Sequence, residues 1–109
     1  RKTLLVVEPL YEETPEVWAG PFTKTISNIA LSYKKNGQIE EAIQFGKKAL
    51  AIRGSLHEEN PDVWVEDYLT SIGNLSMAYS AGGQKGLAIV LGKDALDIVR
   101  PLHEEAPSA

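Results

Sequence analysis

Apolar residues recur along this chain at the three-to-four-residue spacing of a helix face. From Pro61 onward they fall at Val63, Trp64, Tyr68, Ile72, Leu75 and Tyr79. This stripe stops at Gly82–Gly83, where the sequence predicts a helix end. A second stripe follows at once, at Leu87, Ala88, Leu91, Ala95, Leu96 and Ile98. Because the connection between them is so short, the two predicted helices are expected to be antiparallel neighbours.

The same pattern occurs 46 residues earlier. Aligning residues 1–63 with residues 47–109 gives 25 identities in 63 pairs, whereas ordinary composition alone gives about four. The chain is therefore expected to be a repeat protein. The predicted fold is all-α, a superhelix of about five antiparallel helices in one domain. Residues 1–13 would end a preceding second helix, residues 14–59 would form the first repeat, and residues 60–105 the second. The start at Arg1, inside a predicted helix, suggests a piece of a longer protein.

Local sequence signals mark the expected ends of these helices. Thr14-Pro15-Glu16 and Asn60-Pro61-Asp62 each combine a possible side-chain cap, a proline at the first helical position and an acidic residue. Gly20-Pro21 falls inside a predicted helix, so we expect a kink or two separate segments there. Pro9 and Pro101 are similarly expected to bend or end their helices.

Composition narrows the classes of partner. A net charge of -4 argues against a nucleic-acid surface, which needs a basic face. The longest apolar run, Leu4 to Val7, is too short for a membrane span or a signal peptide. The chain has no Cys, so it has neither disulfides nor thiolate metal sites. We expect a cytoplasmic protein with no nucleic-acid or membrane partner.

No motif predicts catalysis, a metal or a cofactor. His57-Glu58-Glu59 and its copy at 103–105 lack a second His three or four positions away, so a solvated helix end explains them better than a metal site. Gly82–Gly86 lacks the spacing and the preceding strand of a phosphate-binding loop. Ser27 or Ser80 could act as a nucleophile only beside a general base, and the sequence shows no such base for either. We therefore expect a protein that is not an enzyme.

The recurring residues resemble the tetratricopeptide repeat, in a lengthened form of 46 residues. The motif positions are Ile26, Ile29-Ala30, Tyr33, Gly37, Ala42, Gly46 and Ala49, repeated as Ile72, Leu75-Ser76, Tyr79, Gly83, Ala88, Gly92 and Ala95. The Asn-Ile-Ala and Asn-Leu-Ser triplets are most similar to the kinesin-light-chain type and to related long arrays.

The resemblance implies a protein or peptide partner held in a concave groove lined by the first helix of each repeat. Carried over to this sequence, the groove positions are Lys24, Ser27, Asn28, Leu31, Lys34, Lys35, Thr70, Asn74 and Met77, with Gly73, Ser80 and Ala81 beside them. The amides of Asn28 and Asn74 could bind a peptide backbone, or they could instead bond within the repeats. The three lysines could favour an acidic peptide or form a plain solvated face. Ser27, Leu31, Gly73 and Met77 stand where the family's chaperone-tail clamp has Lys and Asn, so that clamp is not expected.

Two further pairs of residues predict packing between repeats. Trp18 and Trp64 occupy equivalent positions, and we expect them to pack between successive repeats rather than bind a ligand. Gly46 and Gly92 stand where the family has a bulky residue, which favours close helix approach over a tolerated defect. Apolar residues at both ends support a second hypothesis: self-assembly into a homo-oligomer through uncapped ends. These residues are Leu4–Val7 at one end and Leu96, Ile98 and Val99 at the other.

Overall fold

The computed structural model describes the backbone of residues 2–105 and the side chains of residues 8–100 except Glu16. It contains five helices: α1 (Lys2–Glu13), α2 (Pro15–Lys35), α3 (Ile39–Glu59), α4 (Pro61–Ala81) and α5 (Lys85–Glu105). No strand occurs within residues 2–105. The expected all-α helical repeat is confirmed. The predicted end patch Leu4–Val7 lies outside the described side chains.

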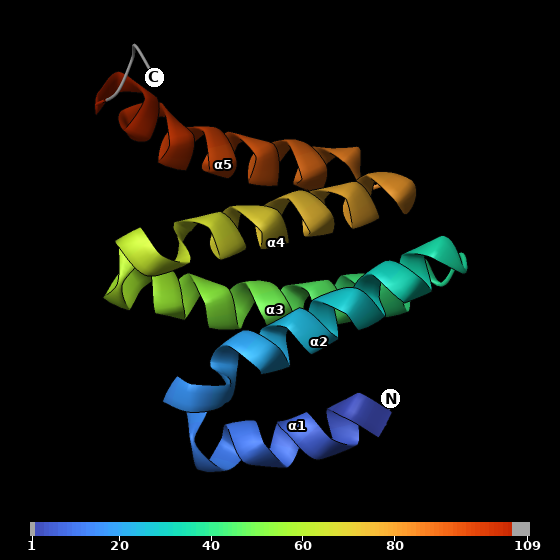
Figure 1. Ribbon diagram of the computed structural model, residues 1–109. Coiled ribbons are helices and arrows are strands. Elements are labelled where there is room, and N and C mark those ends of the chain that lie inside the picture. The colour runs from blue at the N-terminus through green and yellow to red at the C-terminus, as the bar shows by residue number, and fades with distance from the viewer. Residues whose placement is uncertain (1, 106–109) are drawn as a thin grey trace.

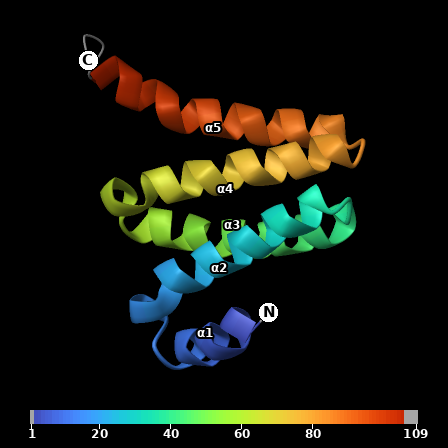
Figure 2. The ribbon, with the colours of Figure 1, turned by 45° about the vertical axis from the view of Figure 1, so that its right-hand side comes forward.

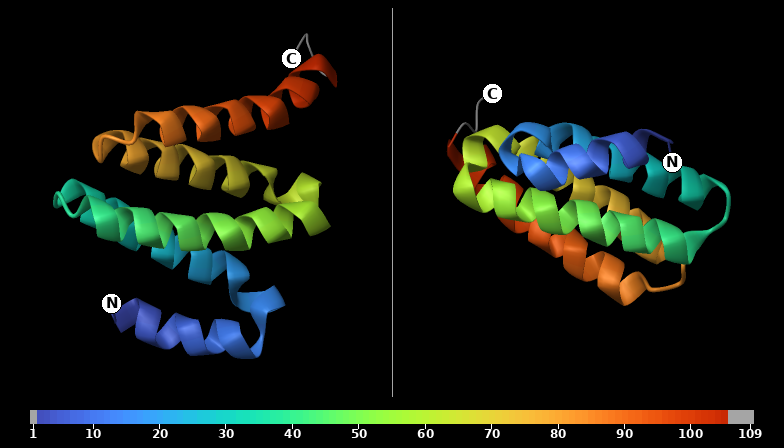
Figure 3. Two further views of the ribbon diagram at one scale, coloured as in Figure 1. Left: turned by 180° about the vertical axis from the view of Figure 1, so that it is seen from behind. Right: turned by 90° about the horizontal axis from the view of Figure 1, so that it is seen from below.

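The helices zigzag in chain order into a single stack, with the two ends of the chain at opposite ends of it (Figures 1 and 2). Each helix packs against its neighbours in sequence, and α2 also touches α4, whereas α3 and α5 do not contact each other over the described residues. Viewed from behind, α3 lies in front of α2 (Figure 3, left). The first helices of the two repeats therefore approach on one side of the stack, and the second helices are separated on the other.

The turns inside the two repeats are built from the same hydrogen bonds. Gly37 and Gly83 have φ of 81° and 82°, the left-handed conformation that glycine adopts without a Cβ clash. After each glycine, the amide of Gln38 donates to the Tyr33 carbonyl and that of Gln84 to the Tyr79 carbonyl, both at 2.8 Å. This six-to-one bond closes a Schellman helix end. It turns the chain sharply, so that α3 and α5 return antiparallel to α2 and α4.

The predicted helix starts are correctly placed, but the predicted side-chain caps are wrong. Neither Thr14 nor Asn60 makes a side-chain capping bond. Their ψ angles are 73° and 77°, away from the extended backbone that carries a capping side chain over the first amides. The prolines that follow have no amide to satisfy. The backbone carbonyls of Thr14 and Asn60 accept bonds from the amides three and four residues later.

Proline does not break any of these helices. The helix α2 is continuous through Pro21, and its first turns are offset from the rest of its axis (Figure 1). Nearby threonine hydroxyls form hydrogen bonds with backbone carbonyls in this part of the helix. Thr23 Oγ1 donates to the Ala19 carbonyl at 2.7 Å, and Thr25 Oγ1 to the Pro21 carbonyl at 2.9 Å. The helices α1 and α5 run through Pro9 and Pro101, so the expectation that these residues could end their helices is wrong.

Matched residues of the two repeats make matched contacts. Tyr11 of α1 stacks on Phe22 of α2, with ring centroids 4.4 Å apart. Forty-six residues later, His57 of α3 stacks on Tyr68 of α4 at 4.8 Å. His57 is half-buried, so its assignment to a merely solvated helix end is wrong. The 46-residue repeat of the sequence is therefore also present in the packing between consecutive helices.

Candidate functional site

The predicted groove residues of α2 and α4 are mostly accessible. Lys24, Asn28, Lys35, Thr70 and Met77 are exposed. The other four, Ser27, Leu31, Lys34 and Asn74, are half-buried. Because α2 and α4 touch each other while α3 lies against both, this pair of helices provides a shared surface on which side chains from both repeats can meet one partner.

Asn28 and Asn74 occupy equivalent places, and neither side chain forms a hydrogen bond with a described residue. This distinguishes them from Asn36, whose amide donates to Gln38 Oε1 at 2.6 Å. The alternative expectation, that these amides bond within or between the repeats, therefore has no support among the described residues. Both amides keep a donor and an acceptor available.

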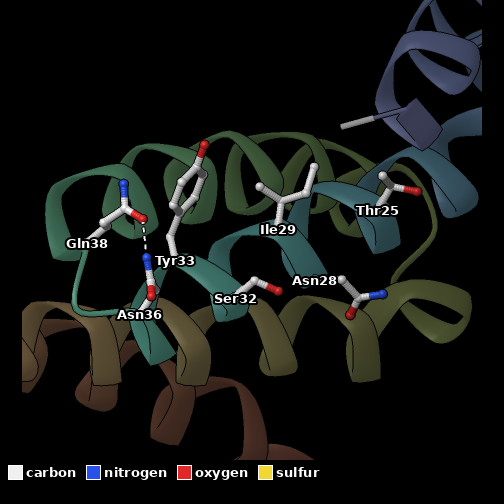
Figure 4. A pocket seen from close by; sticks show the side chains of 7 residues that line it. All are labelled: Thr25, Asn28, Ile29, Ser32, Tyr33, Asn36 and Gln38. Atoms are coloured by element: carbon white, nitrogen blue, oxygen red, sulfur yellow. Dashed lines mark hydrogen bonds between the residues drawn. The ribbon is translucent and has the colours of Figure 1, made fainter.

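A cleft of about 520 Å³ lies along one side of α2. Figure 4 shows Thr25, Ile29 and Tyr33 projecting on one side of the helix, with Asn28 and Ser32 on another. The equivalents of Ile29 and Tyr33 in α4, Leu75 and Tyr79, are only 3% and 8% exposed because α3 covers them. Ile29 and Tyr33 themselves are only half-buried.

The predicted site residues are not gathered in one cavity. Of the nine, only Asn28 lines the cleft on α2. Met77 lines a different hollow, of about 440 Å³, where α4 meets α5. The remaining seven line none of the cavities described for this chain. They lie along the open surfaces of α2 and α4, so any ligand that touched all nine would have to be an extended one.

Sequence reasoning missed Arg53, which joins three helices beneath this surface. Its Nη1 donates to Ser71 Oγ at 2.8 Å and, at longer range, to Ser27 Oγ at 3.4 Å and the Asp67 carbonyl at 3.5 Å. Only 6% of Arg53 is exposed, and its Nε has no hydrogen-bond partner among the described residues. A detectable signal existed, because the equivalent positions 7 and 99 both hold valine. Ser27, a predicted ligand contact, is thus a structural partner of Arg53.

Burial lowers the pKa of Arg53, and the nearby negative charge of Asp67 partly offsets this shift. No described carboxylate forms an ion pair with the guanidinium. The direct contacts of the guanidinium are therefore to hydroxyl and carbonyl oxygens, while the charge of Asp67 acts on it without an ion pair. Such an arrangement fixes geometry without contributing much stability.

The two residue pairs predicted to pack between repeats can be followed individually. A Cβ on Gly20 would lie 3.8 Å from Cη2 of Trp64, so Trp64 of the second repeat packs on α2 of the first, as expected. Trp18 is half-buried. A Cβ on Gly46 would lie 3.1 Å from Cδ1 of Leu75, whereas one on Gly92 would meet nothing within 4 Å. Close approach is therefore confirmed at Gly46 and wrong for Gly92.

Comparison with known families identifies the repeat. Residues 23–62 match the family described as tetratricopeptide repeat, a segment that runs from α2 through α3 into α4. This chain therefore contains a tetratricopeptide repeat. No curated protein and no solved structure gives a significant match. The match does not single out the kinesin-light-chain type among tetratricopeptide repeats.

Tetratricopeptide repeats generally mediate protein–protein interactions, using the extended surfaces that stacked repeats create. Among the described residues, no group of three His, Cys, Asp or Glu side chains is placed to hold a metal ion. None of the described helices has the length and apolar content needed to cross a membrane.

Proposed function

We propose that this domain is a scaffold that binds a peptide segment of a partner protein across the exposed surfaces of α2 and α4. The observation that carries the proposal is the pair Asn28 and Asn74. They lie one repeat apart on touching helices, with amides that have no described hydrogen-bond partner. A side-chain amide binds backbone N–H and C=O groups of an extended peptide whatever its side chains are.

The charge of this surface suggests the kind of peptide. Lys24, Lys34 and Lys35 lie on α2, and no described residue forms an ion pair with them. They belong to a chain of net charge -4. A local positive strip on an acidic protein attracts carboxylates and steers their approach. The proposed ligand is therefore an acidic extended segment, bound by a repeat of kinesin-light-chain type in the cytoplasm.

Peptides selected on the whole domain by display provide the test. Asn28→Ala and Asn74→Ala should each weaken binding of a selected peptide about threefold to tenfold, since each removes hydrogen bonds worth about 0.5–1.5 kcal/mol. Asn60→Ala is the matched control, because Asn60 is exposed and makes no side-chain cap. Equal affinity of all three variants for every selected peptide would reject the α2–α4 surface as the binding site.

A second candidate function is self-assembly through α5. Ile89, Leu96 and Val99 are 58%, 57% and 41% exposed, and they are equivalent to Ile43, Leu50 and Arg53, on the helix that α4 covers. An uncovered helix face of this kind can stack on another copy. Light scattering over a concentration series separates the two functions. A constant monomer mass at high concentration counts against self-assembly and leaves peptide binding intact.

A further inference from the structure

The groove between α3 and α5, on the side of the stack away from the α2–α4 surface, differs chemically from the rest of the repeat. Leu87 and Val90 of α5 are 48% and 55% exposed. Their equivalents in α3 are Glu41 and Gln44, which are also exposed. At these two solvent-facing positions the first repeat therefore has polar residues and the second has large apolar residues.

Leu87 lines two adjoining hollows that share part of their lining, and Val90 lines the first of them. One part, of about 290 Å³, is lined by α3, α4 and α5 and includes Leu50, Leu75 and Val90. An adjoining part, of about 400 Å³, extends toward the start of α3 and includes Ile39 and Ile43. The two parts share Lys47, Tyr79 and Leu87. Along α3 the lining runs from residue 39 to residue 51, roughly 18 Å at the helical rise per residue.

The fold keeps this groove open. The helices α3 and α5 do not contact each other over the described residues, because α4 lies between them and forms the floor. Figure 1 shows α4 between α3 and α5 along their length. Leu75 and Tyr79 of the floor are already buried, so a ligand would gain its apolar contacts mainly from the exposed wall of Leu87 and Val90.

A lysine lies where the two parts of the hollow join. Lys47 is exposed and forms no ion pair with a described residue, unlike its neighbour Lys48, whose Nζ is 3.1 Å from Glu8 Oε2. The part of the groove beside Leu87 and Val90 has Lys47 as its one charged lining residue, whereas the carboxylate of Glu40 lies in the other part, about two helical turns along α3. An apolar surface with one unpaired cation at its edge complements a segment that presents large apolar side chains beside a carboxylate. A helix offers this combination on one face at positions three and four apart.

We infer that the α3–α5 groove is a second docking surface, which binds an acidic amphipathic helix of a partner protein with its leucine-like side chains against Leu87 and Val90 and a carboxylate against Lys47. This surface is separate from the α2–α4 surface proposed above. It requires neither Asn28 nor Asn74.

The probe is a fluorescein-labelled 15-residue helical peptide with Leu at positions i, i+3, i+4 and i+7 and Glu on the flanks, titrated by fluorescence anisotropy. Leu87→Glu with Val90→Gln gives α5 the residues that α3 carries at those positions, so the fold is retained. This double variant and Lys47→Glu should each bind at least tenfold more weakly. Lys93→Glu, equivalent in position but outside the groove, should bind as the unchanged chain does.

Three results would overturn the inference. The first is no binding of the probe to the unchanged chain, and the second is affinity within twofold for both groove variants. The third is a dimer in sedimentation that Leu87→Glu with Val90→Gln dissociates, because a second copy would then be the occupant. Asn28→Ala should leave probe binding unchanged, which separates failure here from failure of the α2–α4 proposal. Amide shifts on probe addition should fall in α3 and α5.

Discussion

The helices α3 and α5 are the same element of two successive repeats, but α3 is enclosed and α5 is covered on one side. α3 packs against both α2 and α4, whereas α5 contacts α4 alone among the described helices. Ala42, Gly46 and Ala49 are buried in α3, and their equivalents in α5 are all half-buried. Similar sequences thus reach different burial because of their place in the stack. In a repeat protein, the exposure of a side chain therefore depends on which helices lie beside it as well as on its residue type.

The strongest test compares the two aromatic stacks. Phe22 is 1% exposed beneath Tyr11, and Phe22→Ala should lower the free energy of unfolding by about 3–5 kcal/mol. The equivalent Tyr68 is half-buried beside His57. Tyr68→Ala should cost about 2 kcal/mol, since less apolar area is lost. Urea denaturation of both variants measures the difference, and equal losses would show that the two interfaces carry equal weight.

Valine at the two equivalent helical glycines should separate a packed position from an open one. Gly46→Val places methyl groups against Leu75, and overpacking should cost about 1–3 kcal/mol. A Cβ at Gly92 would meet no described atom within 4 Å, so Gly92→Val should change stability by less than about 0.5 kcal/mol. Thermal unfolding followed by circular dichroism compares them. A similar loss at Gly92 would indicate that its surroundings are already occupied, for example by another copy.

Arg53 is the point where the interface between the two repeats departs most from the pattern at positions 7 and 99. Arg53→Met should leave stability unchanged or raise it by about 1 kcal/mol, because an apolar side chain of similar length avoids burying a charge that no carboxylate contacts directly. Arg53→Ala, which opens a cavity, is the contrasting variant and should be destabilising. Chemical denaturation of both decides whether the guanidinium contributes through its charge or its volume.

The smallest effect is expected from the bridge between α1 and α3. Lys48 and Glu8 are about half exposed, at 47% and 40% for their side chains, so their coupling in a double-mutant cycle should be about 0.2–1 kcal/mol. The second repeat offers a natural control, since the equivalent pair, Asp94 and Gly54, cannot form an ion pair. High salt should reduce the coupling. A loss on Lys48→Ala that persists at high salt and without Glu8 would point to the Lys48 contact over the Phe22 ring instead.

The sequence was sufficient to predict the helices and their order, because both depend on local signals. Glycine at 37 and 83, proline at 15 and 61, and the apolar spacing each act over a few residues. The role of Arg53 was not predictable in this way, since it depends on partners 14 to 26 residues away on two other helices. Gly92 was mispredicted for a related reason: its residue type fits a close contact, but no described helix lies against it.

The candidate surface was predictable only in part. Helical spacing correctly placed Asn28 and Asn74 on equivalent positions of touching helices. It did not show that Ser27 would accept a bond from Arg53, nor that Leu87 and Val90 would face an open groove. Those outcomes depend on how far neighbouring helices separate, which is decided by packing across the whole stack.

The nearest-neighbour packing of this chain also determines how it comes apart. Apart from the touch between α2 and α4 and the Lys48–Glu8 ion pair between α3 and α1, the described interfaces join helices consecutive in sequence. The entropy cost of loop closure is then small, so folding is expected to be fast. Unfolding is expected to begin at the terminal helix that has the fewest neighbouring helices. Amide exchange should therefore be quickest in α1 and α5 and slowest in α3. The domain is thus expected to unfold progressively from its ends, and a partner bound to α5 would slow unfolding from that end.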